Sequence, residues 1–146
     1  MIIASEMDML NYGRSLGLAS EAGAIIFLKG PLGAGKTTLA RGFLHGLGYE
    51  SRVKSPTYAL VESYELKSGL VFHFDLYRIQ FPRELDEIGI QDYWMPHSIA
   101  LIEWPEKGEG FLPRPDVICT LAIVNQGREV KTVACSLRGE QIMENF

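Results

Sequence analysis

Residues 30–37 read GPLGAGKT, which matches the pattern G-x-x-x-x-G-K-T of a phosphate-binding loop. Glycines in such a loop let main-chain N–H groups turn inward and converge on an anion. Lys36 can then reach the β- and γ-phosphates of a nucleotide, and the Thr37 hydroxyl can bind Mg²⁺. The stretch therefore predicts a site for a nucleotide with a divalent cation.

The flanks of this loop have the patterns that such a site requires. Residues 24–28 form a short apolar run, as a buried strand would. Leu39, Phe43 and Leu47 follow at four-residue spacing, which is typical of an amphipathic helix. The positive end of that helix would point at a bound phosphate. We expect the phosphate contacts to come from Gly33, Ala34, Gly35, Lys36, Thr37 and Thr38.

The size and composition of the chain are those of one globular domain. We expect that domain to span residues 1–146, with 47% hydrophobic and 22% charged residues. No apolar run approaches the roughly 18 residues of a membrane helix, and residues 1–6 do not resemble a secretory signal. Cys119 and Cys135 lie in apolar stretches and are predicted to be buried thiols. These features predict a cytoplasmic protein with no membrane partner.

The charge balance bears on the partners of the protein. The net charge is −4, and the 14 basic residues are scattered along the chain with no two adjacent. Proteins that hold long stretches of nucleic acid cluster their Lys and Arg residues. This distribution argues against DNA as a partner. If the protein serves RNA chemistry, we expect another protein to hold the RNA.

The rest of the chain mixes helical and strand patterns. A helix is predicted from Ser5 to about Ser20, in which Gly13 and Gly17 would allow close packing against a neighbour. A short helix is predicted after Pro82. Strands are predicted at 58–66, 70–76, 98–103, 116–124 and 129–137, and the last residues would form a helical turn or fray. The pattern predicts an α/β fold with a mixed central sheet flanked by helices and a C-terminal antiparallel hairpin.

Two apolar strand patterns end in an acidic residue. Residues 70–74 precede Asp75, and residues 99–102 precede Glu103. An acid just beyond a buried strand lies at the carboxyl edge of the sheet, beside the phosphate loop if the strands are parallel. A nucleotide hydrolase needs an acid to hold Mg²⁺ and a group to orient the attacking water. Asp75 and Glu103 are therefore candidate catalytic residues, and the alternative is that each only caps the next turn.

Three other side chains near these acids are candidates for further roles. Thr57 ends the polar loop over 49–57, and in nucleotide switches this connection often senses the γ-phosphate and its metal. The alternative is a loop with a purely connecting role. Trp104 follows Glu103 and would be a core or lid residue, or would shield a metal site from water. His73 lies inside an apolar strand, where we expect a buried, hydrogen-bonded imidazole and not a ligand.

Five segments of the chain together resemble TsaE (formerly YjeE), the family of bacterial ATPases in tRNA threonylcarbamoyladenosine synthesis. They are 33–38 (GAGKTT), 55–58 (SPTY), 73–78 (HFDLYR), 84–89 (ELDEIG) and 102–106 (IEWPE). The phosphate loop is shared by many families, whereas the other elements in this order are far more specific. The resemblance covers about residue 5 to about residue 117.

The resemblance implies a single phosphate-loop domain that binds ATP, or ADP after hydrolysis, with Mg²⁺. Thr37 and Glu103 match the metal-binding positions of the family, and Lys36 matches its phosphate-binding lysine. Asp75 matches an acid needed for hydrolysis, and Thr57 lies in a switch-like loop. The implied partners are TsaB and TsaD, which transfer the threonylcarbamoyl group to an adenosine beside the anticodon. ATP hydrolysis would support that complex, which would hold the tRNA.

One position departs from the family pattern. The family usually reads Gly-Asp-Leu-Gly at the start of the loop, and residues 30–33 here read GPLG. Proline has no N–H group, but we expect the phosphate-facing N–H groups to lie between about Gly33 and Thr38. Nucleotide binding is therefore expected to survive the change, although the side chain of the usual Asp has no counterpart.

Other functions also use a phosphate loop. A small-molecule kinase generally needs a mobile lid, and the chain after Glu103 leaves little room for one. A GTPase needs a guanine-reading N/T-K-x-D segment, which residues 125–128 (NQGR) do not supply. A nucleotide-dependent interaction module with incidental hydrolysis stays open as an alternative.

Overall fold

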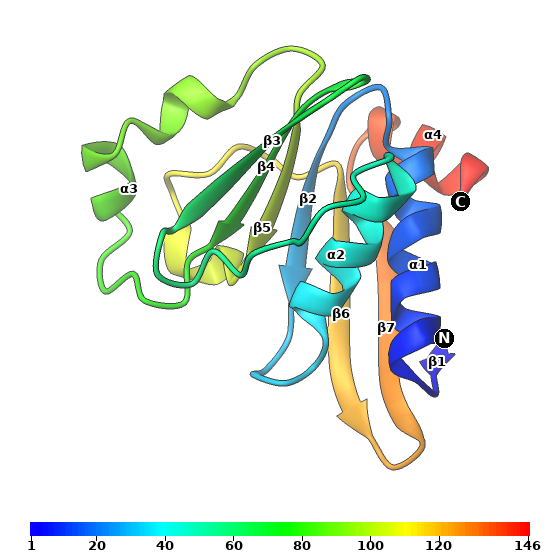
Figure 1. Cartoon of the computed structure of the whole chain (residues 1–146). Helices are drawn as coiled ribbons and strands as arrows, with labels where there is room; N and C mark the ends of the chain where they lie inside the picture. The colour runs from blue at the N-terminus through cyan, green and yellow to red at the C-terminus, as the bar shows by residue number, and fades with distance from the viewer.

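One mixed seven-stranded sheet forms the centre of this computed structural model, which describes all residues from 1 to 146 (Figure 1). Its strands are β1 (Ile2–Ile3), β2 (Ala24–Lys29), β3 (Val61–Leu66), β4 (Gly69–Asp75), β5 (Ile99–Glu103), β6 (Val117–Val124) and β7 (Gly127–Ala134). Their order across the sheet is β1-β7-β6-β2-β5-β4-β3. Strands β6, β2, β5 and β4 run parallel, and β7 and β3 flank them antiparallel. The predicted α/β class with a C-terminal antiparallel hairpin is confirmed.

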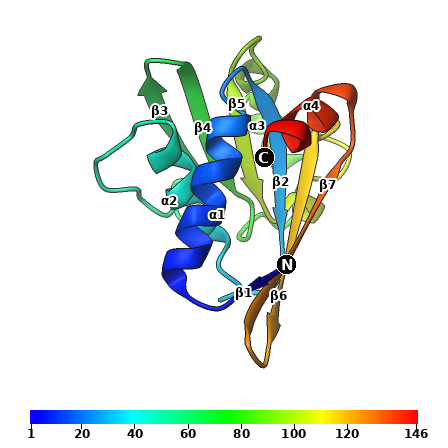
Figure 2. The ribbon, with the colours of Figure 1, turned by 90° about the vertical axis from the view of Figure 1, so that its right-hand side faces the viewer.

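Helices cover both faces of the sheet. They are α1 (Glu6–Ala19), α2 (Lys36–Gly46), α3 (Glu84–Glu87) and α4 (Leu137–Asn145), with 3-10 helices at Ile90–Tyr93 and Pro105–Gly108. Helices α1, α2 and α4 lie on one face and α3 on the other (Figure 1 and Figure 2). The core under α1 and α2 is the larger, with 21 buried residues against 8. None of the helices has the length and apolar character that a membrane crossing requires.

Helices α1 and α2 pack closely because glycines lie at their contact. A Cβ atom on Gly13 would lie 2.2 Å from the carbonyl oxygen of Leu39, and one on Gly17 would lie 2.4 Å from that of Phe43. The predicted N-terminal helix, with glycines that allow close packing, is therefore confirmed. The contact fixes the position of α2 and, with it, the loop from which α2 starts.

Parallel pairing aligns the carboxyl ends of three strands. Glu103, the last residue of β5, pairs with Leu28 of β2 on one side and with Asp75 of β4 on the other. The chain leaves β2 at Lys29 and enters the glycine loop directly. Both acids therefore lie at the sheet edge where that loop starts, as their strand patterns predict.

The structure differs from the predicted elements near three strands. Strand β3 starts at Val61 and not at Tyr58, because the preceding residues form a turn. Strand β7 ends at Ala134 and not near residue 137, because the hydroxyl of Ser136 caps α4. The last residues then form the nine-residue helix α4, which is longer than a single turn. Strand β1 has only two residues, too few for a pattern to predict it.

Both cysteines are free thiols, as predicted. Cys119 is buried in β6, and burial raises the pKa of its thiol to about 11, so that the thiol stays protonated at neutral pH. Cys135 is only half-buried. The prediction of two buried thiols is therefore right for Cys119 and wrong in degree for Cys135.

Replacing Gly13 by Ala is expected to destabilise the fold. The new Cβ cannot fit against the Leu39 carbonyl unless a helix moves, and overpacking of this kind costs about 1–3 kcal/mol. The better helix propensity of Ala, worth about 1 kcal/mol, offsets only part of that cost. Urea denaturation measures the change, with Ser15→Ala on the exposed side of α1 as the control. A Gly13→Ala protein as stable as the wild type would contradict the tight contact.

Candidate functional site

The phosphate loop connects β2 to α2 and is shaped by glycines with left-handed backbone conformations. Gly30, Gly33 and Gly35 have φ angles of 145°, 79° and 105°, at which a side chain would be strained. Gly35 precedes α2 and offers no side chain to cap it. The first N–H groups of α2 are therefore left for another acceptor, such as a phosphate.

Lys36 provides the ammonium group of this loop, and the residue is only 5% exposed. Its Nζ donates hydrogen bonds to the carbonyl oxygens of Gly30 and Pro31, at 2.5 and 2.9 Å. The Nζ also lies 4.3 Å from the centre of the Trp104 ring. Burial lowers the pKa of Lys36, and nearby carboxylates, chiefly that of Glu103, oppose this shift. The ammonium is thus held at the loop, on two oxygens that a phosphate could replace.

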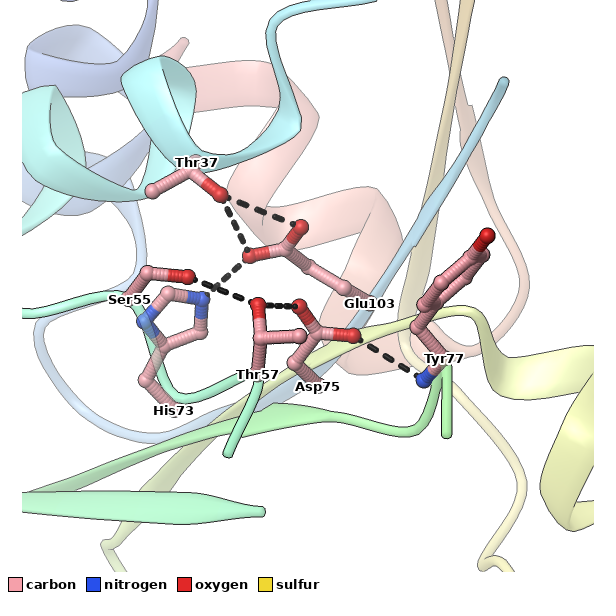
Figure 3. Close-up of polar contacts among 7 residues, drawn as sticks. All are labelled: Thr37, Ser55, Thr57, His73, Asp75, Tyr77 and Glu103. Atoms are coloured by element: carbon pink, nitrogen blue, oxygen red, sulfur yellow. Dashed lines mark hydrogen bonds and ion pairs between the residues drawn. The ribbon is translucent and has the colours of Figure 1, made fainter. Parts of the chain in front are cut away.

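Thr37 and Glu103 face each other beside the start of α2 (Figure 3). The Thr37 hydroxyl donates to the Glu103 carboxylate, and its Oγ1 lies 3.2 Å from Oε2 and 3.4 Å from Oε1. Glu103 is only 2% exposed. Hydroxyl and carboxylate oxygens are ligands that Mg²⁺ prefers. The two residues expected to bind a metal are therefore neighbours in the structure.

Asp75 lies beside this pair and is held by two donors (Figure 3). The Thr57 hydroxyl donates to Oδ2 at 2.9 Å, and the Tyr77 amide donates to Oδ1 at 3.0 Å. The hydroxyl of Ser55 is 2.9 Å from that of Thr57. The loop expected to act as a switch therefore contacts Asp75 through Thr57. A ligand that engages Thr57 would release one oxygen of Asp75.

These side chains line one cavity of about 270 Å³ at the carboxyl edge of the sheet. Its walls contain Gly33, Gly35, Lys36, Thr37, Thr38, Thr57, Asp75, Glu103 and Trp104. Among the expected phosphate contacts, Ala34 alone is missing from this wall, because its side chain is fully buried. Its amide donates to the carbonyl of Pro31 and so closes a turn within the loop. The structure thus brings the expected site residues together, with Ala34 beneath them.

His73 is also part of this neighbourhood. It is fully buried, and its Nε2 lies 2.6 Å from Oε2 of Glu103 (Figure 3). The other ring nitrogen, Nδ1, has no hydrogen-bond partner. The expectation of a buried, hydrogen-bonded imidazole is therefore met at one nitrogen and not at the other.

Arg128 is a residue of this region that the sequence does not reveal. From the start of β7, its Nε and Nη2 donate to the carbonyl oxygen of Gly33, at 3.2 and 3.0 Å. It also lines a second cavity of about 340 Å³ next to the loop, together with residues 3–6 and Met9. Arg128 belongs to no motif and is distant from the loop in sequence. Only the sheet order, in which β6 pairs with β2 and β7 pairs with β6, brings it there.

The donor set of the first cavity fits a phosphate group bound with Mg²⁺. The buried carboxylates of Asp75 and Glu103 face a single ammonium group, that of Lys36, which leaves an excess of negative charge. No three His, Cys, Asp or Glu side chains gather anywhere in the chain to hold a metal by themselves. A divalent cation here would complete its ligands with phosphate oxygens and water, as Mg²⁺ commonly does.

The profile of the threonylcarbamoyl adenosine biosynthesis protein TsaE matches residues 3–132. The chain belongs to the TsaE family. A relative from Haemophilus influenzae, the tRNA threonylcarbamoyladenosine biosynthesis protein TsaE, is 43% identical over 99% of this chain and 94% of its own. The proteins of that name from Treponema pallidum and Bacillus subtilis are each 32% identical, over 89% and 87% of this chain and 96% and 80% of theirs.

A solved structure confirms the fold of this TsaE family member. The crystal structure of Bacillus subtilis YdiB superimposes with a TM-score of 0.81 at 25% identity, and the match covers 97% of this chain and 88% of YdiB. The resemblance carried by the five sequence segments is therefore confirmed. The shared fold also includes the C-terminal part of the chain, which carries none of those segments.

The contact between Lys36 and Trp104 is expected to report nucleotide binding through fluorescence. Phosphate groups at the loop would draw the ammonium away from the ring, which changes the emission of Trp104. Trp94→Phe removes the other of the two tryptophans, and titration of this variant with ADP and Mg²⁺ measures the change. Adding Lys36→Ala should abolish the response. Unchanged emission under conditions where calorimetry detects ADP binding would contradict the movement of Lys36.

Proposed function

We propose that this protein binds ATP with Mg²⁺ and hydrolyses it in support of TsaB and TsaD, which threonylcarbamoylate tRNA. The observation that carries the proposal is the Thr37 hydroxyl 3.2 Å from the buried Glu103 carboxylate, at the end of a glycine loop that holds Lys36. The hydroxyl and the carboxylate suit Mg²⁺, and the loop suits a chain of phosphates. Membership of the TsaE family supports the place in tRNA modification.

The residues of the loop would stabilise charge on the phosphates. In the proposed reaction, water attacks the γ-phosphate in line, and ADP leaves. Lys36 would exchange its two carbonyl acceptors for oxygens of the β- and γ-phosphates, and the loop N–H groups would bind the oxygens where charge gathers. When held by Thr37 and Glu103, the magnesium ion supplies further neutralisation of that charge.

Asp75 is placed to act on the attacking water. Its carboxylate lies in the same cavity as Lys36 and Thr37 and is only 5% exposed. It would orient or deprotonate the water, or hold a water bound to the metal. Thr57, which donates to Asp75, would sense the γ-phosphate, and Trp104 would shield the cavity from bulk water.

The second cavity offers room for the nucleoside. It shares Gly33, Gly35 and Thr38 with the phosphate cavity, so a nucleotide could extend from one cavity into the other. Arg128 stands at this junction on the Gly33 carbonyl, where its guanidinium would meet the ribose and α-phosphate side of the nucleotide.

The proposed role in tRNA modification is to support turnover of the TsaB–TsaD complex and not to transfer the threonylcarbamoyl group. The net charge of −4 and the scattered basic residues fit a protein that leaves the tRNA to its partners. The free energy of ATP binding or hydrolysis would then change the contacts between this protein and the TsaB–TsaD complex. We place the protein in the cytoplasm, where tRNA is modified.

Substitutions should separate the roles of the two acids. Asp75→Asn is expected to lower the turnover number about 100-fold or more, because a water-orienting acid contributes roughly 10²–10⁴. Glu103→Ala should instead raise the Mg²⁺ concentration needed for half-maximal activity by about tenfold or more. Phosphate release and Mg²⁺ titrations measure both, with Glu65→Gln on the exposed side of β3 as the control. Full activity of Asp75→Asn would make Asp75 a structural residue.

The products formed from ATP should decide between the proposed function and its alternatives. The protein is expected to release phosphate from ATP without a second acceptor, and to do so faster with TsaB and TsaD. Radiolabelled γ-phosphate, followed by chromatography, measures both free phosphate and any phosphorylated metabolite. Label on a metabolite would support a kinase, and partner binding that requires ATP without its cleavage would support an interaction module.

A further inference from the structure

The His73 side chain is a fully buried polar group within a strand of the central sheet. It lies in β4 on the same face as Val71 and Asp75, because side chains alternate along a strand. Val71 belongs to the larger core, and His73 itself is fully buried. An imidazole at this depth is costly, since Nδ1 has no partner and an unsatisfied buried polar group costs about 1–3 kcal/mol.

The polar contact that His73 does make is with Glu103. Its Nε2 lies 2.6 Å from Oε2, and a carboxylate only accepts, so the hydrogen of this bond is on Nε2. The Thr37 hydroxyl approaches the same carboxylate, at 3.2 Å from Oε2 and 3.4 Å from Oε1. Oε2 therefore accepts hydrogen bonds from both His73 and Thr37. Oε1 has only the longer contact with Thr37. Short bonds to a charged acceptor are among the stronger hydrogen bonds in proteins.

Glu103 contacts His73 although a cation, Lys36, lines the same cavity. Lys36 and Glu103 line one cavity, and the carboxylate acts on the pKa of Lys36, yet no ion pair joins the two side chains. Lys36 binds loop carbonyls instead. A carboxylate without its imidazole donor would be free to turn toward the ammonium, and both groups would then be lost to a bound nucleotide.

We propose that His73 is a positioning residue that fixes the Glu103 carboxylate so that Oε1 is presented to Mg²⁺ beside Thr37. The inference rests on the proposed function, because it assigns a role in the magnesium site of that function. It adds a residue that never touches the nucleotide or the metal. Donors behind a metal-binding side chain orient it, and their loss typically weakens metal binding about 10- to 100-fold.

The test compares two substitutions of nearly equal shape, His73→Gln and His73→Met. Both side chains are unbranched at Cβ and Cγ, but only Gln carries an N–H donor near the position of Nε2. Val71→Ala, in the same strand and core, is the control for loss of stability alone. Calorimetric titration of Mg²⁺ into the ADP-bound protein measures the affinity for the metal without turnover. Titration of ADP in the presence of EDTA measures the affinity for the nucleotide without a divalent cation, which depends on the phosphate loop and not on the metal ligands.

We expect His73→Met to weaken Mg²⁺ binding about tenfold or more and His73→Gln to recover most of that loss. ADP binding in EDTA and the Mg²⁺ affinity of Val71→Ala should match the wild type. In a Glu103→Ala background, His73→Met should have no further effect on Mg²⁺ affinity, because its target is gone. Circular dichroism and thermal melting establish that each variant is folded at the assay temperature.

Three outcomes would overturn the inference, and they are distinguishable. If the wild type binds ADP with Mg²⁺ and His73→Met binds Mg²⁺ equally well, or if Gln and Met weaken it equally, then His73 is a core residue only. If the wild type itself shows no Mg²⁺-dependent nucleotide binding, the proposed function fails, and the role of His73 fails with it. Should His73→Met not fold, His73→Phe, which also lacks an N–H donor, takes its place in the comparison with His73→Gln, and the same results overturn the inference.

Discussion

The register of three parallel strands is the constraint on which the site depends. Leu28, Glu103 and Asp75 lie in one row across β2, β5 and β4. A slip of one residue would turn each acid to the opposite face of the sheet, where Phe74 and Ile102 form part of the smaller core. Burial of apolar side chains on both faces therefore holds the carboxylates beside the loop, without any direct bond between the two acids.

The close contact of α1 with α2 completes this geometry from the other side. Strands alone would fix the acids but not the helix that carries Thr37. Gly13 and Gly17 let the backbone of α1 approach that of α2, and the large core beneath them orients both helices. The distance between Thr37 and Glu103 thus results from helix packing and sheet pairing together. This explains why glycines far from the cavity matter for its shape.

Local patterns were enough to predict most of the fold and the main site residues. The loop, the strand before it and the helix after it are consecutive in sequence, and each acid follows its own apolar run. Arg128 and the bond from His73 to Glu103 could not be predicted in this way, because each joins segments that only the sheet order brings together. The sequence does not indicate the turn before Val61, because its residues, among them an exposed Tyr58, suit a strand by composition.

The electrostatics of the cavity explain how such a site could select its ligand. The chain carries a net charge of −4, and two buried carboxylates face the phosphate loop, so a bare triphosphate would meet repulsion. The single charge of Lys36 and the partial charges of the loop N–H groups offset only part of that repulsion. In the proposed function, a divalent cation would turn the carboxylate of Glu103 from a repelling group into a ligand of the incoming complex and would offset the charge of Asp75. The two acids would thus favour binding of the nucleotide–metal complex over the metal-free nucleotide. The orientation of the Glu103 carboxylate would determine the size of that preference.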